Sequence, residues 1–309
     1  KAFVFSWPHE AGTIPPKYKD DKTVLCYYLS DRIRPHKWGV WAAHEATAHQ
    51  HAPRQPAVFT MRGLWGGIDR FCPDVRGRCM EYYHYHWDRN RSPHMHFALL
   101  EQYRRASAAN GHVPICRVVE TRAEDMRKTR QTIFTSLAYG VRGFRTGGRG
   151  LFDTEQRDDR GVPTPTEFGE EFKKINGAIN AYSPVLKIAR CQSVFHVEPL
   201  PPGCEAAPED SWVQLNGREV LVGVFRSPAD EAKLTSDEET RYLLVANRDA
   251  FSAQTAVLDL RGGPFHVQRM DKTTAKWIDH ASQTTGATTR VKSAMEEGSG
   301  ELLKVVSKK

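Results

Sequence analysis

The residues with the greatest chemical potential lie in one aromatic and histidine-rich run at positions 81–88, which reads EYYHYHWD. In a β-strand, alternate side chains share a face. One face of such a strand carries Tyr82, His84, His86 and Asp88. Aromatic rings, imidazoles and carboxylates are side chains suited to binding sugars, through ring stacking and hydrogen bonds to hydroxyls. We expect these four residues, together with Trp65, to contact a carbohydrate; the alternative is a strand whose histidines are hydrogen-bonded inside the core.

The same histidines allow a metal-site interpretation, because His84-x-His86 is followed by His94-x-His96. The pair is similar to the His-x-His of amidohydrolase barrels, but that family places it on the first strand and completes it with further ligands that this chain lacks. His94 and His96 fall at a helix start, where residues two apart do not face the same way. We expect no metal site and no cofactor, and we keep a metal-dependent hydrolase as a rival hypothesis.

Arginines flank the last strand expected in the front part of the chain, at Arg142, Arg145 and Arg149. On neighbouring loops, guanidinium groups could bind the sulfate or carboxylate groups of an anionic glycan. A solvated rim is the plainer interpretation. The glycine-rich stretch 146–150 lacks the Gly-Lys-Ser/Thr ending of a phosphate-binding P-loop. Arg142 and Arg145 are therefore candidate ligands for an anionic sugar.

Strands and helices that could position these residues alternate through the front of the chain. Strands are expected at 23–29, 57–61, 79–87, 113–119 and 141–145, with a further one at 2–7, and helices at 36–49, 93–110, 124–139 and 166–182. Strands separated by helices indicate right-handed βαβ units and a parallel sheet. A complete (β/α)8 barrel needs eight strands and about 250 residues. The pattern therefore predicts an α/β fold, a partial or complete TIM-type barrel, over residues 1–187.

After residue 187 the pattern changes to short strands separated by turns, with no helix evident. The turn markers include Asn216-Gly217, Gly262-Gly263 and Gly298-Ser299-Gly300. Six or more short strands at this spacing are typical of an antiparallel β-sandwich. We therefore expect a second, all-β domain over residues 188–309.

Charge is unevenly distributed in this chain of 309 residues and net charge +7. Residues 1–185 hold 28 Lys+Arg and 20 Asp+Glu, a balance of +8, whereas residues 186–309 hold 16 and 17, a balance of −1. No basic run interleaved with aromatics accompanies this excess, so we expect no nucleic-acid partner. No apolar run is long enough to cross a bilayer, so we also expect no membrane span.

The six cysteines form no CxxC pair. Cys72 with Cys79, or Cys191 with Cys204, could close short loops as disulfides in an oxidising compartment, and single thiols are the alternative. The chain begins with Lys1 rather than Met and is expected to be a processed product or a fragment.

Residues 134–144, FTSLAYGVRGF, resemble the end of a β-galactosidase-like glycoside hydrolase barrel of the clan A type, in which a helix ending in Ala-x-Gly-x-x-Gly precedes the eighth strand. Gly140 and Gly143 suit the tight turn and the close backbone approach needed there. Residues 298–305, GSGELLKV, resemble the last strand of the small β-domain that follows such barrels. The resemblance extends over about residues 20–306.

This resemblance implies a retaining mechanism, with an acid/base carboxylate after the fourth strand and a nucleophile at the end of the seventh. If residues 141–145 are the eighth strand, then 113–119 is the seventh and Glu120 follows it. Residues 23–29 become the fourth strand, which ends on Ser30-Asp31. The resemblance thus implies Glu120 as nucleophile and Asp31 as acid/base. Without it, Glu120 reads as a loop carboxylate paired with an arginine, and Asp31 as a helix N-cap.

The chain departs from the family at Arg32, where the acid/base Glu of an Asp-Glu pair is expected. A neighbouring guanidinium lowers the pKa of a carboxyl group, the opposite of what a general acid needs. Either Asp31 has taken the role, or Glu81 or Asp88 has, or the site is inactive. We expect a glycoside hydrolase acting on a galactose-like or anionic polysaccharide, and we keep a non-catalytic glycan-binding relative as an alternative. A polysaccharide substrate would favour a secreted or periplasmic protein.

Overall fold

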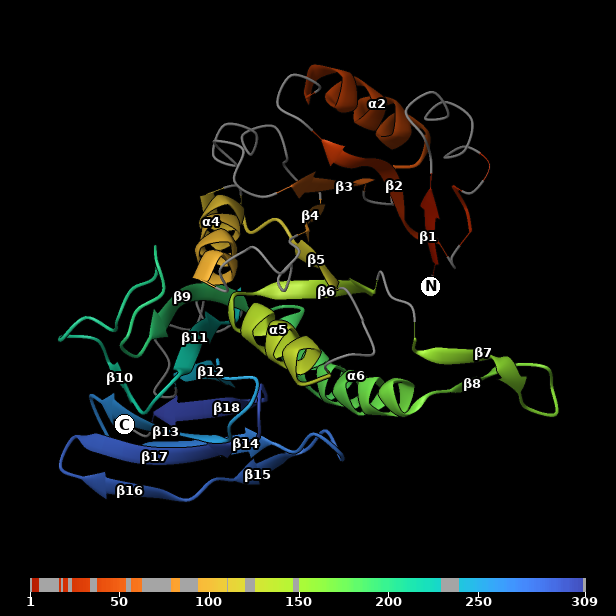
Figure 1. Cartoon of the computed structure of the whole chain (residues 1–309). Coiled ribbons are helices and arrows are strands. Elements are labelled where there is room, and N and C mark those ends of the chain that lie inside the picture. The colour runs from red at the N-terminus through yellow and green to blue at the C-terminus, as the bar shows by residue number, and fades with distance from the viewer. Residues whose placement is uncertain are drawn as a thin grey trace. The chain divides into compact units, whose positions relative to one another are not determined.

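The structure is a computed structural model that describes residues 2–5, 17, 19–21, 24–33, 38–53, 57–62, 79–83, 94–109, 111–119, 126–146, 150–228 and 239–307. The chain divides into two compact units. The first contains Lys1–Val118 and Gly143–Arg145, and the second contains Val119–Arg142 and Thr146–Lys309. Figure 1 labels their helices and strands in chain order. Each unit is treated below by itself.

A parallel sheet forms the centre of the first unit. Its strands are β1 (Ala2–Phe5), β2 (Val24–Ile33), β3 (Ala57–Arg62), β4 (Cys79–Tyr83), β5 (Ile115–Val119) and β6 (Val141–Thr146), in that order across the sheet. The four pairings from β1 to β5 are all parallel. Helices α2 (Trp38–His51) and α4 (His94–Ala109) connect β2 to β3 and β4 to β5. Consecutive strands joined through helices are the βαβ pattern that the sequence predicts.

Gly140 and Gly143, in the run of residues 134–144, occupy positions that suit glycine, as the sequence predicts. Helix α5 (Met126–Ala138) ends just before Gly140, whose φ of 83° is the left-handed conformation that glycine accepts at a helix C-terminus. Gly143 on β6 lies against β5, where an added Cβ would come within 2.6 Å of the Cys116 sulfur. Both positions therefore need the absence of a side chain, one for its dihedral angle and one for space.

The described residues of the second unit form helices, a two-stranded hairpin and two larger antiparallel sheets. Figure 1 labels these elements. Helix α5 is buried along most of its length, and it packs on β11 (Val220–Arg226) and β12 (Thr240–Asn247) as well as on α6 (Glu167–Leu186). The hydroxyl of Thr166 caps α6 by accepting a hydrogen bond from the Gly169 N–H at 3.1 Å. Before α6, β7 (Phe152–Arg157) and β8 (Pro163–Pro165) form a hairpin.

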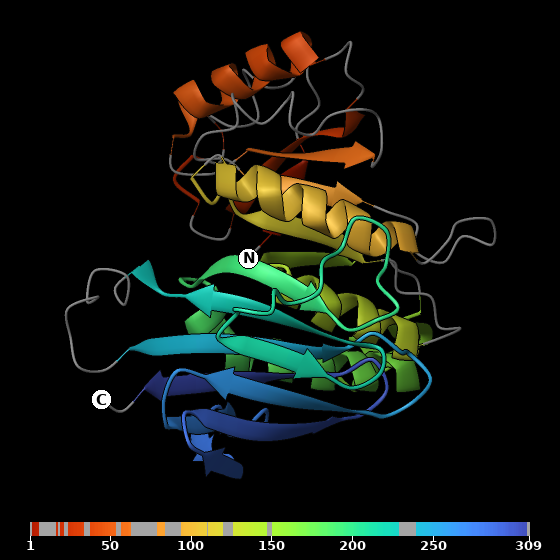
Figure 2. The same cartoon turned by 90° about the vertical axis from the view of Figure 1, so that its left-hand side faces the viewer.

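The antiparallel strands form one six-stranded and one four-stranded sheet, seen in layers from teal to blue in Figure 2. The first sheet has the order β15 (Trp277–Asp279), β14 (Phe265–Met270), β18 (Gly300–Ser307), β12, β11 and β9 (Arg190–His196). The second has the order β10 (Val213–Asn216), β13 (Gln254–Arg261), β17 (Thr288–Met295) and β16 (Ser282–Thr285).

Both sheets contribute to one hydrophobic core, which includes Val222, Leu243 and Leu303 from the first and Leu258 and Val291 from the second. Strand β17 alternates buried and exposed residues because only one of its faces meets this core. Strand β11 is buried at nearly every position because α5 packs on its other face. The hydrophobic pattern of each strand therefore follows the number of layers that cover it.

The observed elements agree closely with the sequence expectations, and the differences are instructive. The 23–29 strand is longer, running to Ile33, and the described part of the 79–87 strand ends at Tyr83. Within the described residues no pairing joins β6 back to β1, so a closed barrel is not observed. The domain boundary predicted at residue 187 lies between α6 and β9. The two compact units of the structure divide after Val118.

Candidate functional site

Two of the sequence-predicted residues lie at the carboxyl ends of strands in the parallel sheet, and a third follows one of these strands in the chain. Tyr82 is the next-to-last residue of β4 and pairs in register with Met61 on β3 and Arg117 on β5. Arg145 is the next-to-last residue of β6, and Glu120 follows the last residue of β5 in the chain. The carboxyl edge of a parallel sheet is where α/β proteins bind their ligands.

Asp31 lies inside β2 rather than at its end, which corrects the expected strand boundary. The paired positions along β2 and β3 are Ser30 with Phe59 and then Ile33 with Met61. Two residues of β2, Asp31 and Arg32, therefore stand opposite one residue of β3. This arrangement is a β-bulge, a feature that is frequent beside active sites because it redirects side chains. The strand continues past Asp31, so Asp31 is not the N-cap of the following helix.

Five of the predicted sugar-site residues lie outside the described residues. They are Trp65, His84, His86, Asp88 and Glu120. Their roles stay predictions from the sequence. Within the described residues there is no group of three or more His, Cys, Asp or Glu side chains arranged to hold a metal ion.

Arg142 and Arg145 lie within β6 rather than on loops beside it. The Arg142 guanidinium is half-buried and donates a hydrogen bond from Nη2 to the Ala189 carbonyl oxygen at 3.1 Å. Burial lowers the pKa of Arg142, and the charge of Arg190 lowers it further. Three residues apart in a strand, Arg142 and Arg145 point to opposite faces, so at most one of them can face a given ligand.

A buried pair that the sequence analysis did not select lies next to this edge. Arg117 on β5 and His96 on α4 both have an exposed fraction of 0%. The Arg117 Nη1 atom lies 3.0 Å from His96 Nδ1 and 3.5 Å from Nε2. Because a guanidinium can only donate, the imidazole must present a lone pair and is therefore neutral. The signal in the sequence is a charged residue in the centre of an otherwise apolar strand, residues 115–119.

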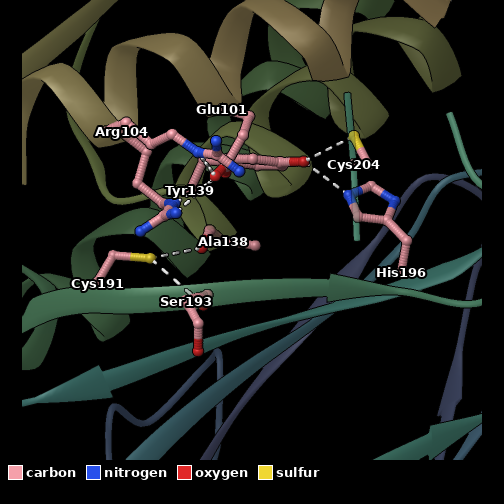
Figure 3. A network of polar contacts seen from close by, with 9 residues as sticks. Glu101, Arg104, Ala138, Tyr139, Cys191, Ser193, His196 and Cys204 are labelled. Carbon is pink, nitrogen blue, oxygen red and sulfur yellow. Dashed lines mark hydrogen bonds and ion pairs between the residues drawn. The ribbon is translucent and has the colours of Figure 1, made fainter. Parts of the chain in front are cut away.

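A second buried polar network lies in the other unit, around the turn after α5 (Figure 3). The Tyr139 hydroxyl lies 2.6 Å from His196 Nε2 and 3.5 Å from the Cys204 sulfur. Burial lowers the pKa of His196 to about 3, and the charge of Arg248 contributes to this shift. His196 is therefore neutral near pH 7. Its contact with Tyr139 links the turn after α5 to the end of β9.

The same network excludes one of the disulfides that the sequence allowed. The Cys191 thiol contacts the Ala138 carbonyl oxygen at 3.5 Å, and the Cys204 thiol instead faces Tyr139 (Figure 3). Both are thiols, as is Cys116. The alternative pair, Cys72 with Cys79, is not tested because Cys72 lies outside the described residues.

No helix in the described part of the chain combines the length and the apolar character needed to cross a membrane.

Comparison with known proteins gives matches at the level of structure. No protein-family model matches the chain. No curated protein sequence matches it either. Among solved structures, a glycoside hydrolase family 5 protein from Bacteroides vulgatus aligns over 98% of this chain and 67% of its own, with a TM-score of 0.54 and 12% identity.

Two further structures are similar to the same degree. A protein named as a glycoside hydrolase aligns over 97% of this chain and 68% of its own, with a TM-score of 0.52 and 11% identity. A rhamnosidase from a Novosphingobium species aligns over 88% of this chain but only 39% of its own, with a TM-score of 0.53 and 10% identity. At these identities the likeness concerns the fold alone. The chain has a glycoside hydrolase-like fold.

Proposed function

We propose that this chain is a glycosidase that cleaves a galactose-like or anionic polysaccharide by a retaining, two-carboxylate mechanism, on a barrel whose fourth to eighth strands are β2 to β6. The observation that carries the proposal is the order of the parallel sheet. If β6 is the eighth strand of such a barrel, this order counts β5 as the seventh strand and β2 as the fourth. Glu120 then follows the seventh strand, and the Asp31–Arg32 bulge interrupts the fourth.

In this mechanism Glu120 attacks the anomeric carbon while a second carboxylic acid, Asp31, protonates the leaving oxygen. The sugar–oxygen bond breaks as the bond to Glu120 forms. Asp31, now ionised, takes a proton from the water that releases the sugar. The two carboxyl groups must lie about 5 Å apart for this chemistry. Tyr82 and the aromatic and histidine residues that follow it would hold the sugar by stacking and hydrogen bonds.

A specific observation favours a second candidate, a non-catalytic glycan-binding protein. Arg32 shares the bulge with Asp31. A guanidinium beside a carboxylate stabilises its ionised form and so weakens it as a general acid. A chain that lost its acid would retain the aromatic residues that bind sugar. The two candidates differ only in whether the bound sugar is cleaved.

Replacing the proposed nucleophile tests the function directly. In Glu120→Gln we expect kcat to fall on the order of 10³-fold or more, because no glycosyl-enzyme intermediate can form. The substrates are p-nitrophenyl β-galactoside and a set of neutral and uronic-acid polysaccharides. Binding of the polysaccharide, measured by affinity electrophoresis, should persist in Glu120→Gln. The exposed Glu170→Gln on α6 is the matched control and should keep full activity.

Each result has one meaning. Binding without cleavage in the parent chain supports the glycan-binding candidate, and activity that survives in Glu120→Gln rejects the retaining proposal. Activity that is lost with a chelator and restored with zinc would favour the metal-dependent hydrolase instead.

A further inference from the structure

The hairpin of β7 and β8 is an exposed arm of the second unit. In Figure 1 it extends beyond the N-terminal end of α6. Its strands pair through Phe152 with Pro165 and Asp153 with Thr164. The side chain of Phe152 has an exposed fraction of 54%. A large aromatic ring this exposed is available to a ligand.

The tip of the hairpin is ordered by its own polar contacts. The Asp158 Oδ1 atom accepts hydrogen bonds from the N–H groups of Arg160 and Val162, both at 2.9 Å. Its Oδ2 atom pairs with the Arg160 guanidinium at 2.9 Å. Arg157 donates to the Gly161 carbonyl oxygen at 2.6 Å. A two-stranded hairpin alone is marginally stable in water, so these contacts help to hold its shape.

The base of the hairpin is fixed to the start of α6. The Thr166 hydroxyl donates to the Gly150 carbonyl oxygen at 2.5 Å, and the Thr166 N–H donates to Leu151 at 3.1 Å. Gly169 lies so close to Leu151 that any Cβ would overlap its carbonyl oxygen. The arm is therefore pre-organised, which reduces the conformational entropy lost when it binds something.

The net charge of the arm favours neutral sugars over anionic ones as its ligand. Between residues 150 and 165 it holds four acids (Asp153, Glu155, Asp158 and Asp159) and two bases (Arg157 and Arg160), a balance of −2 in a chain of net charge +7. Carboxylates accept hydrogen bonds from sugar hydroxyls but repel uronate or sulfate groups. We infer that this hairpin is a binding arm for a neutral polysaccharide, with Phe152 as the residue that stacks on a sugar ring. The inference rests on the proposed function and narrows its substrate.

Replacing Phe152 tests the arm. We expect Phe152→Ala to raise KM for neutral galactan or mannan roughly fivefold to tenfold, since ring stacking of this kind supplies a modest part of the affinity. KM for p-nitrophenyl β-galactoside, which carries a single sugar and no polysaccharide chain for the arm to bind, should not change, and kcat should be preserved for both substrates. Phe251→Ala is the matched control, because Phe251 is 50% exposed in the same unit and lies outside the arm.

The substrate class is tested in the same assay. Neutral galactan or mannan should bind the parent chain more tightly than polygalacturonate, and Asp153→Asn with Glu155→Gln should reduce that preference. Circular dichroism checks that each variant is folded.

Three results would overturn the inference. The first is an unchanged KM for the neutral polysaccharide in Phe152→Ala, together with loss of cleavage in Glu120→Gln. In that case the arm has no role in binding, and the proposed function stands. Another is a lower mass of Phe152→Ala in light scattering with unaltered glycan binding, which would make the arm a surface for self-association. If no polysaccharide binds and no glycoside is cleaved by the parent chain, the proposed function fails together with the arm.

Discussion

Single buried residues decide several properties of this chain, and the pair of Arg117 and His96 illustrates how. A guanidinium with no exposed surface needs an acceptor, and His96 supplies one. Their 21-residue separation spans a whole helix, so no local pattern in the sequence connects them. Arg117 can be identified from the sequence as a charged residue in an otherwise apolar strand. Its partner His96 can be identified only from the packing of α4 on β5.

The pH dependence of stability follows from another buried residue, His196. Its pKa is lowered from 6.5 to about 3 in the folded chain, so between these values the unfolded chain binds a proton that the folded chain does not. Its contribution to stability is complete above pH 6.5 and is lost as the pH falls, by about 1.4 kcal/mol per pH unit.

His196→Gln should remove the contribution of His196 to the pH dependence of stability. The free energy of unfolding of this variant should therefore depend less steeply on pH between 4 and 6.5 than that of the parent chain. Urea unfolding at a series of pH values measures the slope. His49→Gln, an exposed change on α2, should reproduce the parent slope. Equal slopes for all three chains would contradict the buried, neutral state of His196.

At the scale of elements, the contact of α5 with β11 depends on Gly223. An added Cβ at this position would overlap the Ala138 carbonyl oxygen, and backbone atoms cannot move aside as a flexible side chain can. We expect Gly223→Ala to lower the free energy of unfolding by about 1–3 kcal/mol, the usual cost of overpacking. Denaturant midpoints measure the change.

Gly177 on α6 provides the matched control, because an added Cβ there meets no atom within 4 Å. Gly177→Ala should instead stabilise the chain by up to about 1 kcal/mol, from the higher helix propensity of alanine. A Gly223→Ala variant as stable as Gly177→Ala would show that α5 can move away from β11.

The elements also show which parts of the fold could be predicted from sequence. Apolar runs and glycine stops place most helices and strands within a few residues, as for α5 and its end at Gly140. The sequence does not predict the hairpin of β7 and β8, because more than half of its residues are polar or charged. Its order comes from hydrogen bonds of Asp158 and Thr166, which leave no hydrophobic periodicity in the sequence. The bulge at Asp31 was missed because it depends on the register with β3.

For the candidate site, strand ends could be predicted but side-chain contacts could not. Counting strands gives the position of Glu120 after β5, since that requires only element order. Whether Arg142 meets a ligand depends on tertiary contacts, and its guanidinium in fact binds the Ala189 carbonyl oxygen.

At the scale of the whole molecule, the two units should unfold separately, since each has its own sheet system and the second has its own core. The tryptophans make this measurable. Five of the seven are in the first unit, namely Trp7, Trp38, Trp41, Trp65 and Trp87. Tryptophan fluorescence therefore reports mainly on that unit, whereas far-ultraviolet circular dichroism reports on both.

We expect urea transitions followed by these two probes to differ in midpoint, the usual sign of more than one cooperative unit. Coincident transitions with a single midpoint would show that the chain unfolds as one. Repeating the experiment with Gly223→Ala separates the units, because only the second should lose stability.

The order of strands in the six-stranded antiparallel sheet has a consequence for biosynthesis. Strand β18 is the last described strand to be translated, yet it lies between β12 and β14. Until residues 300–307 have left the ribosome, both neighbouring strands carry an unpaired edge, and such edges recruit other chains. A nascent chain paused before Gly300 would thus be a natural client for chaperones, and a premature stop codon there would be expected to yield aggregates rather than a shortened functional protein.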